Sequence, residues 1–249
     1  GTHQFYQGRL NQAHTNYQQA LALFEAENDL GHAASIYNQF GYIASQQGDY
    51  ERAKASHQKA IELAQEIAAQ GNGYKRLFAG AYNSLGIVAS IQAAGDVAID
   101  NFEKSIGIYE ELDLPREGAH VYTNLAMAYV DAQEWEAAGA CYAEATTLAE
   151  QSGNLLTLSG IYINRAEFLL NITSIDAAQL YCDKALEIFQ RSNDILGIAE
   201  AYKFHGCIHR HRGEWEPATD AFNHCIQLYQ SCRNPQGEAE GCYEFGLMY

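Results

Sequence analysis

Residues 37–53 read YNQFGYIASQQGDYERA, and residues 202–218 read YKFHGCIHRHRGEWEPA, with matching residue types at the same spacing. In both stretches a tyrosine is followed by a glycine four residues later and by an alanine sixteen residues later. The tyrosine recurs along the chain at Tyr37, Tyr82, Tyr122, Tyr162 and Tyr202. A repeat with a period of about 40 residues indicates a solenoid.

Three columns of small residues accompany the tyrosine in every copy. The first stands four residues after it, at Gly41, Gly86, Ala126, Ala166 and Gly206. The second stands sixteen residues after it, at Ala53, Ala98, Ala138, Ala178 and Ala218. The third follows seven residues later, at Ala60, Ser105, Ala145, Ala185 and Cys225. Small and apolar residues in this pattern predict two closely packed amphipathic helices in each copy. We therefore expect an all-α chain of about twelve or thirteen helices without a sheet.

This spacing of small and large residues resembles the tetratricopeptide repeat over nearly the whole chain. The period of about 40 residues is longer than the roughly 34 residues usual for that family. It is similar to the extended repeats of LGN-type adaptors, kinesin light chain and bacterial tetratricopeptide regulators. The resemblance implies a right-handed α-α superhelix made of a single array over residues 1–249, with about six repeats. The expected repeats are 1–30 (partial), 31–73, 74–114, 115–154, 155–194, 195–234 and 235–249 (partial).

Turn residues separate the expected helices. Turns within repeats are predicted at Gly48-Asp49, Gly95-Asp96, Gln133-Glu134 and Gly213-Glu214. In the third copy, Ala93-Ala94-Gly95 replaces the usual turn residues and matches the pattern least well. Turns between repeats are predicted at Asn28-Asp29, Gly153-Asn154, Ser192-Asn193-Asp194 and Asn234-Pro235, as helix stops followed by N-caps. The interval between Tyr37 and Tyr82 is longer than the others, and its extra residues around Ala69–Gly73 predict a longer loop or an extra turn.

Both ends of the chain fall inside a repeat. Residues 8–21 match the second half of a copy, and residues 241–246 match the first half of another. Terminal repeats usually carry a polar cap, and neither end shows that pattern. We therefore expect truncated ends and a covalent link to further domains in the full-length protein.

Composition narrows the class of partner. The chain has 15 basic and 31 acidic side chains, a formal net charge of −16, which disfavours nucleic acid and anionic membranes as partners. No stretch approaches the roughly 18 apolar residues of a membrane-spanning helix. Six cysteines occur without a C-x-x-C pair, so we expect free thiols, Cys182 and Cys225 buried, and a reducing, cytoplasmic location.

The sequence contains no recognisable catalytic motif. It lacks a phosphate-binding glycine loop, an H-E-x-x-H pair and a G-x-S-x-G elbow, so we expect neither an enzyme nor a cofactor. His205 and His209 are four residues apart and could face one metal ion. Cys207, the obvious third ligand, would point away from their line by about two 100° steps. We therefore expect packing histidines and no metal site.

In tetratricopeptide arrays the first helix of each pair lines a concave groove, and the resemblance implies that this groove binds the ligand. The corresponding positions that we select as ligand-binding are Asn38, Tyr42, Asn83, Asn124, Met127, Asn164, Glu167, Lys203 and Arg210. The four asparagines resemble a ladder that holds a peptide backbone, since an amide both donates and accepts. Asn38 and Asn83 lie one residue earlier than Asn124 and Asn164, a rotation of about 100°. A solvated polar face explains the same residues equally well.

These observations predict a non-enzymatic interaction module that binds a peptide or partner domain in its groove. Only Lys203 and Arg210 are basic among the selected positions, which disfavours the Lys-Asn-Arg clamp by which some relatives hold chaperone C-termini. An extended ligand would contact backbone-binding amides at one end and place a carboxylate near these two cations at the other. The alternative is a ligand-sensing domain of a larger bacterial signalling or transcriptional regulator.

Overall fold

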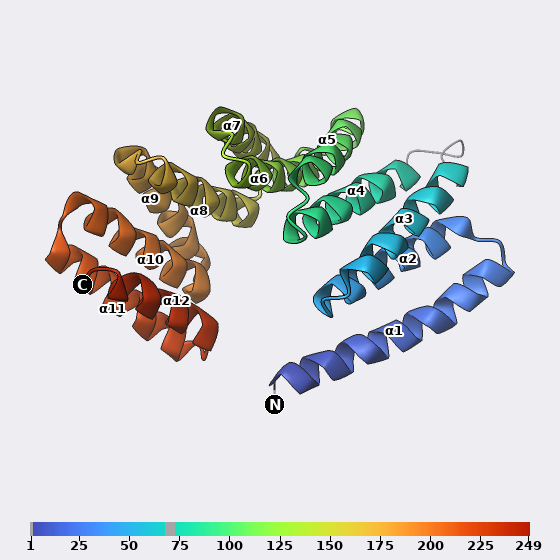
Figure 1. Cartoon of the computed structure of the whole chain (residues 1–249), viewed down its shortest axis with the longest axis horizontal. Helices are drawn as coiled ribbons and strands as arrows, with labels where there is room; N and C mark the ends of the chain where they lie inside the picture. The colour runs from blue at the N-terminus through green and yellow to red at the C-terminus, as the bar shows by residue number, and fades with distance from the viewer. Residues whose placement is uncertain (1, 68–72) are drawn as a thin grey trace. The chain divides into compact units, whose positions relative to one another are not determined.

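The structure, a computed structural model, describes residues 2–67 and 73–249 (Figure 1). In those residues it contains helices and no strand, which confirms the all-α prediction and the expected number of helices. The twelve helices of the described residues are α1 (Thr2–Ala26), α2 (Leu30–Gln46), α3 (Tyr50–Ile67), α4 (Gly73–Ile91), α5 (Gly95–Glu111), α6 (Pro115–Asp131), α7 (Trp135–Ser152), α8 (Leu155–Asn171), α9 (Ile175–Ser192), α10 (Ile195–Arg212), α11 (Trp215–Ser231) and α12 (Pro235–Gly246).

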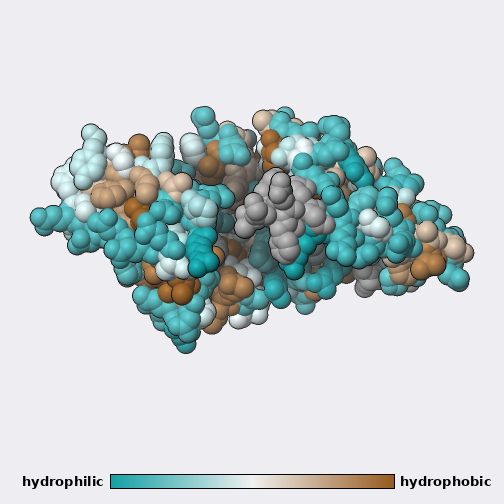
Figure 2. Space-filling view, turned by 90° about the horizontal axis from the view of Figure 1, so that it is seen from below, coloured by the Kyte–Doolittle hydropathy of each residue, from teal (hydrophilic) through white to brown (hydrophobic). Residues whose placement is uncertain are grey.

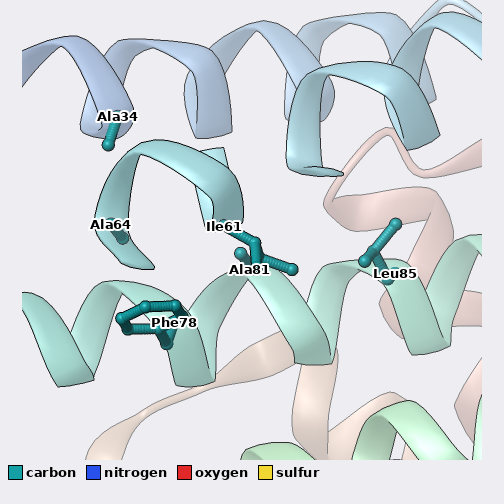
Figure 3. Packing of buried hydrophobic residues seen from close by; sticks show 6 residues of the cluster. All are labelled: Ala34, Ile61, Ala64, Phe78, Ala81 and Leu85. Atoms are coloured by element: carbon teal, nitrogen blue, oxygen red, sulfur yellow. The ribbon is translucent and has the colours of Figure 1, made fainter. Parts of the chain in front are cut away.

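The chain forms two compact units, residues 1–134 and residues 135–249. In the first unit, α2 packs against α3 and α4 packs against α5, as the two helices of one repeat. The first helices α2, α4 and α6 also contact their neighbours in this series. A core cluster fills the space between α2, α3 and α4, which shows that apolar burial joins successive repeats (Figure 3). Its buried members are Ala34, Ile61, Ala64, Phe78, Ala81 and Leu85.

The second unit repeats this arrangement. Helix α8 packs against α9, and α10 packs against α11, while α10 also contacts α8 and α12. Ala199, Cys225 and Tyr229 form a buried cluster between α10 and α11, with Tyr202 and Leu228 packed against it. The tyrosine column therefore contributes to the packing inside a repeat.

The glycines four residues after the tyrosine lie directly under a ring of the second helix. A Cβ atom on Gly206 would come within 2.5 Å of the Phe222 ring, and a Cβ on Gly86 would come within 2.5 Å of Phe102. Gly41 has the same relation to the His57 ring, at 2.5 Å. These contacts confirm that small residues at this position permit the two helices to approach.

Residues in the left-handed conformation separate successive helices. From Ala93 to Arg233 they recur at a constant interval of half a repeat, although most of them are not glycine. The predicted turns at Gly48, Gln133 and Gly213 are confirmed, with φ of 78°, 60° and 75°. The members of the series after Gly48 are Ala93, Asp113, Gln133, Gly153, Thr173, Asn193, Gly213 and Arg233.

The turn of the third copy lies at Ala93, inside the predicted segment Ala93-Ala94-Gly95 and two residues before the predicted pair Gly95-Asp96. Ala93 has φ of 57° and ends the segment, while Gly95 already belongs to α5. The length of the packed helices determines where this turn lies. Every later half-repeat has the same length, although residues of different types adopt the left-handed conformation at its end. The longer loop expected around Ala69–Gly73 lies outside the described residues except for Gly73, where α4 begins.

Side-chain caps begin the inter-repeat helices as expected. The carboxylate oxygen of Asp194 accepts a hydrogen bond of 3.0 Å from the Gly197 amide. Asp29, Asn154 and Asn234 accept the equivalent bond at 3.0–3.1 Å. Pro115 and Pro235 lie in the first turn of α6 and α12, where a missing N–H costs little.

The cysteines of the described residues are all free thiols, and four of them are buried. Cys182 donates a hydrogen bond to the Ala201 carbonyl at 3.3 Å, and burial raises the pKa of the Cys225 thiol to about 12. Both thiols thus occupy the interior, as their columns predicted. Among the described residues, no helix has the length and apolar character that crossing a bilayer requires.

Candidate binding surface on the first helices

The fifth residue after the tyrosine is exposed on three successive first helices of the first unit. Tyr42 on α2, Ile87 on α4 and Met127 on α6 are 53%, 40% and 51% exposed. Large apolar side chains at one repeated position form a row that helix packing does not use. In the space-filling view, the mainly hydrophilic surface carries several hydrophobic patches (Figure 2). The row, here called the apolar row, can contact apolar side chains of a ligand.

Two of the selected asparagines meet beside the apolar row. Asn124 Nδ2 on α6 donates a hydrogen bond of 2.9 Å to Asn83 Oδ1 on α4. The bond forms although Asn83 follows its column tyrosine by one residue and Asn124 follows its own by two. Both residues are half-buried, and each amide retains donor or acceptor capacity for a backbone group of a ligand.

Asn38 has a different environment from the other two. Its Oδ1 lies 2.6 Å from Nδ1 of His57, the buried ring on α3. Desolvation by burial lowers the pKa of His57 to about 4, so the imidazole is neutral at pH 7 and its Nδ1–H donates to Asn38. Asn38 therefore satisfies a buried group inside its own repeat.

Two of the selected residues of the second unit, Glu167 and Lys203, line a pocket between α8, α10 and α12. Its volume is about 390 Å³. Asn164 is half-buried on α8, while Glu167 of the same helix and Lys203 of α10 face this pocket. The complete lining is Glu167, Lys203, Phe204, Cys207, Ala239, Glu240, Tyr243 and Glu244.

Both selected cations of the second unit are paired with glutamates. Lys203 Nζ lies 2.6 Å from the Glu200 carboxylate and 3.2 Å from that of Glu240. Arg210 donates to the Glu244 carboxylate at 2.9 Å and to the backbone carbonyl of the same residue at 2.6 Å. These neighbours neutralise the two charges that we expected to meet a ligand carboxylate.

Glu167 is the carboxylate of this pocket that makes no ion pair or hydrogen bond within the described residues. Loss of hydration raises the pKa of Glu167, although the residue as a whole is exposed, and the carboxylates of Glu200 and Glu240 raise the pKa further. Lys203 acts in the opposite direction. Three glutamates and one lysine line the pocket, so it presents net negative charge where the sequence predicted a mixed-charge end formed by Glu167, Lys203 and Arg210.

Sequence reasoning missed the hydrogen bonds of the tyrosine column. The hydroxyl of Tyr122 donates to Glu110 at 2.8 Å, and that of Tyr162 donates to Glu150 at 3.0 Å. Each bond joins a first helix to the helix before it, twelve residues earlier in the chain. A glutamate stands twelve residues before Tyr37, Tyr122 and Tyr162 in the sequence, and this offset could have revealed the interaction.

The histidines of α10 contact polar side chains of their own unit. No group of three His, Cys, Asp or Glu residues in the described part of the chain is arranged to hold a metal ion. His205 instead contacts Gln179, whose Nε2 lies 3.1 Å from its Nδ1, and His209 lies 2.5 Å from the Glu214 carboxylate.

Several solved structures share this fold at low sequence identity. BtubC from P. vanneervenii aligns with a TM-score of 0.77 at 19% identity, over 91% of this chain and 92% of that one. The Rap conjugation gene regulator of plasmid pLS20, in complex with the Phr* peptide, aligns with a TM-score of 0.69 at 17% identity, over 90% and 60%. A signal-transduction ATPase from Pyrococcus horikoshii with a tetratricopeptide repeat sensor aligns with a TM-score of 0.75 at 17% identity, over 93% and 36%.

Family models describe most of the chain. A tetratricopeptide repeat model matches residues 1–66, and the soluble NSF attachment protein model matches residues 113–244, more than half of the 249 residues. No curated protein matches in sequence. The matches and the helical pairs agree with the extended tetratricopeptide repeats inferred from the tyrosine period. The chain therefore belongs to the tetratricopeptide repeat proteins and, within them, to the soluble NSF attachment protein family.

Proposed function

We propose that this chain is a non-enzymatic interaction module that binds a peptide or a partner domain on its first helices. The observation that carries the proposal is the apolar row, in which Tyr42, Ile87 and Met127 are exposed at the same position of three repeats. A surface that combines such side chains with amides able to bind a peptide backbone, here Asn83 and Asn124, suits an extended peptide. Asn164, Glu167, Lys203 and Arg210 lie on the first helices α8 and α10 of the second unit, and we propose them as ligand-binding residues within that unit.

The Rap regulator supports this proposal, because its structure contains a bound Phr* peptide on a similar fold. The negative charge around Glu167 favours a ligand with a basic group at that pocket. The net charge of −16 supports a protein or peptide partner over nucleic acid or an anionic membrane. The free, buried thiols favour a cytoplasmic location.

Binding of display-selected peptides to a matched pair of variants tests the proposal. Peptides selected on the immobilised chain should bind the variant Tyr42→Ser/Ile87→Ser/Met127→Ser at least about tenfold more weakly, since the removed side chains supply apolar contact area. Leu23→Ser/Val97→Ser/Leu180→Ser is the control, because it removes three exposed apolar side chains from second helices. An equal loss of peptide affinity in both variants would contradict the proposal.

A second candidate function is ligand sensing within a larger regulator. The observation that favours it is the similarity to the Pyrococcus horikoshii ATPase, which has a tetratricopeptide repeat sensor. This chain aligns with 36% of the length of that protein. Under this hypothesis the first helices bind a signal and a covalently linked domain responds. The full-length gene would reveal an adjoining effector domain, and its activity should change when a selected peptide is added.

A further inference from the structure

A second pocket lies in the second unit between α9, α10 and α11, and it shares no lining residue with the pocket at Glu167. Its volume is about 570 Å³, within the range of small-ligand sites. Aromatic rings, two carboxylates and a few apolar side chains form its walls. The lining residues are Asp183, Leu186, Tyr202, His205, His209, Pro217, Asp220, Ala221 and His224.

We propose that this α9–α11 pocket binds a guanidinium group, either of an arginine side chain or of a free small molecule. The pocket shares no residue with the apolar row, so the proposal does not rest on the function proposed for that row. Three features of the pocket support it: its rings, its charge and the position of its carboxylates.

The rings provide flat faces for a planar cation. The Tyr202 and His224 rings meet edge to face with 4.3 Å between centroids, and the His205 and His209 rings are stacked at 6.5 Å. Burial lowers the pKa of His205, which keeps this imidazole uncharged near neutral pH. Guanidinium stacks on such rings through cation–π attraction, and its plane matches them better than an ammonium does.

The charge of the pocket selects a cation. Two carboxylates line it, whereas none of its lining residues is lysine or arginine. The Asp183 carboxylate is held in place, because Gln179 Nε2 donates to its Oδ1 at 2.8 Å. His205 Nε2 lies 3.3 Å from the same oxygen without a well-aligned hydrogen bond. This arrangement leaves Asp183 Oδ2 available, and Asp220 makes no hydrogen bond or ion pair within the described residues.

A titration followed through the imidazole NMR signals tests the proposal on the whole chain. The probe is Nα-acetyl-arginine amide, and its uncharged counterpart is Nα-acetyl-citrulline amide. The arginine probe should shift the signals of His205, His209 and His224 in a saturable way, while the citrulline probe should bind roughly tenfold more weakly or not at all. Agmatine is a free guanidinium compound and serves as the second probe. Tighter binding of agmatine indicates a small-molecule ligand, and tighter binding of the arginine probe indicates an arginine side chain.

The variant Asp183→Asn/Asp220→Asn should weaken the arginine probe by roughly tenfold, because it removes both carboxylates without changing side-chain size. Asp176→Asn/Glu187→Gln is the control, since it removes two exposed carboxylates of α9 that do not line the pocket. Equal affinity for arginine and citrulline probes, undiminished binding by the Asp183→Asn/Asp220→Asn variant, or saturable binding of acetate would each overturn the proposal.

Discussion

Single residues decide how closely the two helices of a repeat approach. Gly206 faces the Phe222 ring, and any side chain at this position would have to displace that ring. Gly160 lies on α8 in the same unit, and a Cβ atom there would meet nothing within 4 Å. The same residue type therefore has a packing role at one position and none at the other.

We expect Gly206→Leu to lower the free energy of unfolding by roughly 1–3 kcal/mol through overpacking against Phe222. Gly160→Leu should leave stability unchanged or raise it slightly, because leucine is the better helix former on an open face. Urea denaturation of both variants measures the difference. Equal stability of the two variants would show that Gly206 is not at the helix contact.

We expect His57 to make the first unit sensitive to acid, because its pKa is lowered by burial. Its pKa is about 4 in the folded chain and 6.5 without burial, so the unfolded chain binds a proton more readily between these values. The contribution of the neutral ring to the free energy of unfolding is complete above pH 6.5 and is lost as the pH falls toward about 4. At 1.36 kcal/mol per pKa unit, this contribution is roughly 3 kcal/mol.

We expect His57→Phe to remove this part of the pH dependence. Phenylalanine already occupies the equivalent position at Phe102 and Phe222, opposite Gly86 and Gly206, so the ring should fit above Gly41. Denaturation at neutral pH and near pH 4 should show a smaller loss for the variant than for the natural chain. The same loss in both proteins would assign the acid sensitivity to other groups.

At the scale of the elements, the half-repeat keeps its length even where the residue at its end disfavours the left-handed conformation. Thr173 follows α8 with φ of 58°, a conformation that β-branched residues adopt at a cost. Gly213 holds the corresponding position after α10 with φ of 75°. Helix packing in the second unit therefore overrides local preference at Thr173.

We expect Thr173→Gly to stabilise the chain by about 1 kcal/mol, because glycine reaches the left-handed region without a Cβ clash. Gly213→Ala should have the opposite sign for the same reason. Thermal melting monitored by circular dichroism compares the two with the natural chain. A lower melting temperature for Thr173→Gly would mean that the threonine side chain contributes more than its backbone costs.

The helices and most turns could be predicted from sequence because they depend on short-range periodicity. The small-residue columns and the N-caps at Asp29 and Asp194 follow from local spacing. The turn predicted at Gly95-Asp96 was misplaced because helix packing, rather than the presence of a glycine, determines which residue adopts the left-handed conformation. The tyrosine–glutamate bonds were missed because they need residues twelve apart to be compared across a turn.

At the scale of the whole molecule, the fold was predictable and the electrostatics of the candidate surface were not. Lys203 and Arg210 are neutralised by Glu200, Glu240 and Glu244. Glu240 and Glu244 lie on α12, so their pairing depends on how α10 and α12 are superposed in space. Asn38 likewise turns to His57 because that ring is buried without another partner for its Nδ1. A column of residue types does not contain this information.

The two methionines report whether a ligand binds on the first helices. The chain has two methionines, Met127 in the apolar row and Met248 after α12. Methyl-labelled methionine therefore gives two NMR signals, which a Met127→Leu variant assigns. A display-selected peptide that binds the chain should shift the Met127 signal to saturation and leave the Met248 signal in place. Saturated binding of the peptide with an unmoved Met127 signal would contradict binding on the first helices.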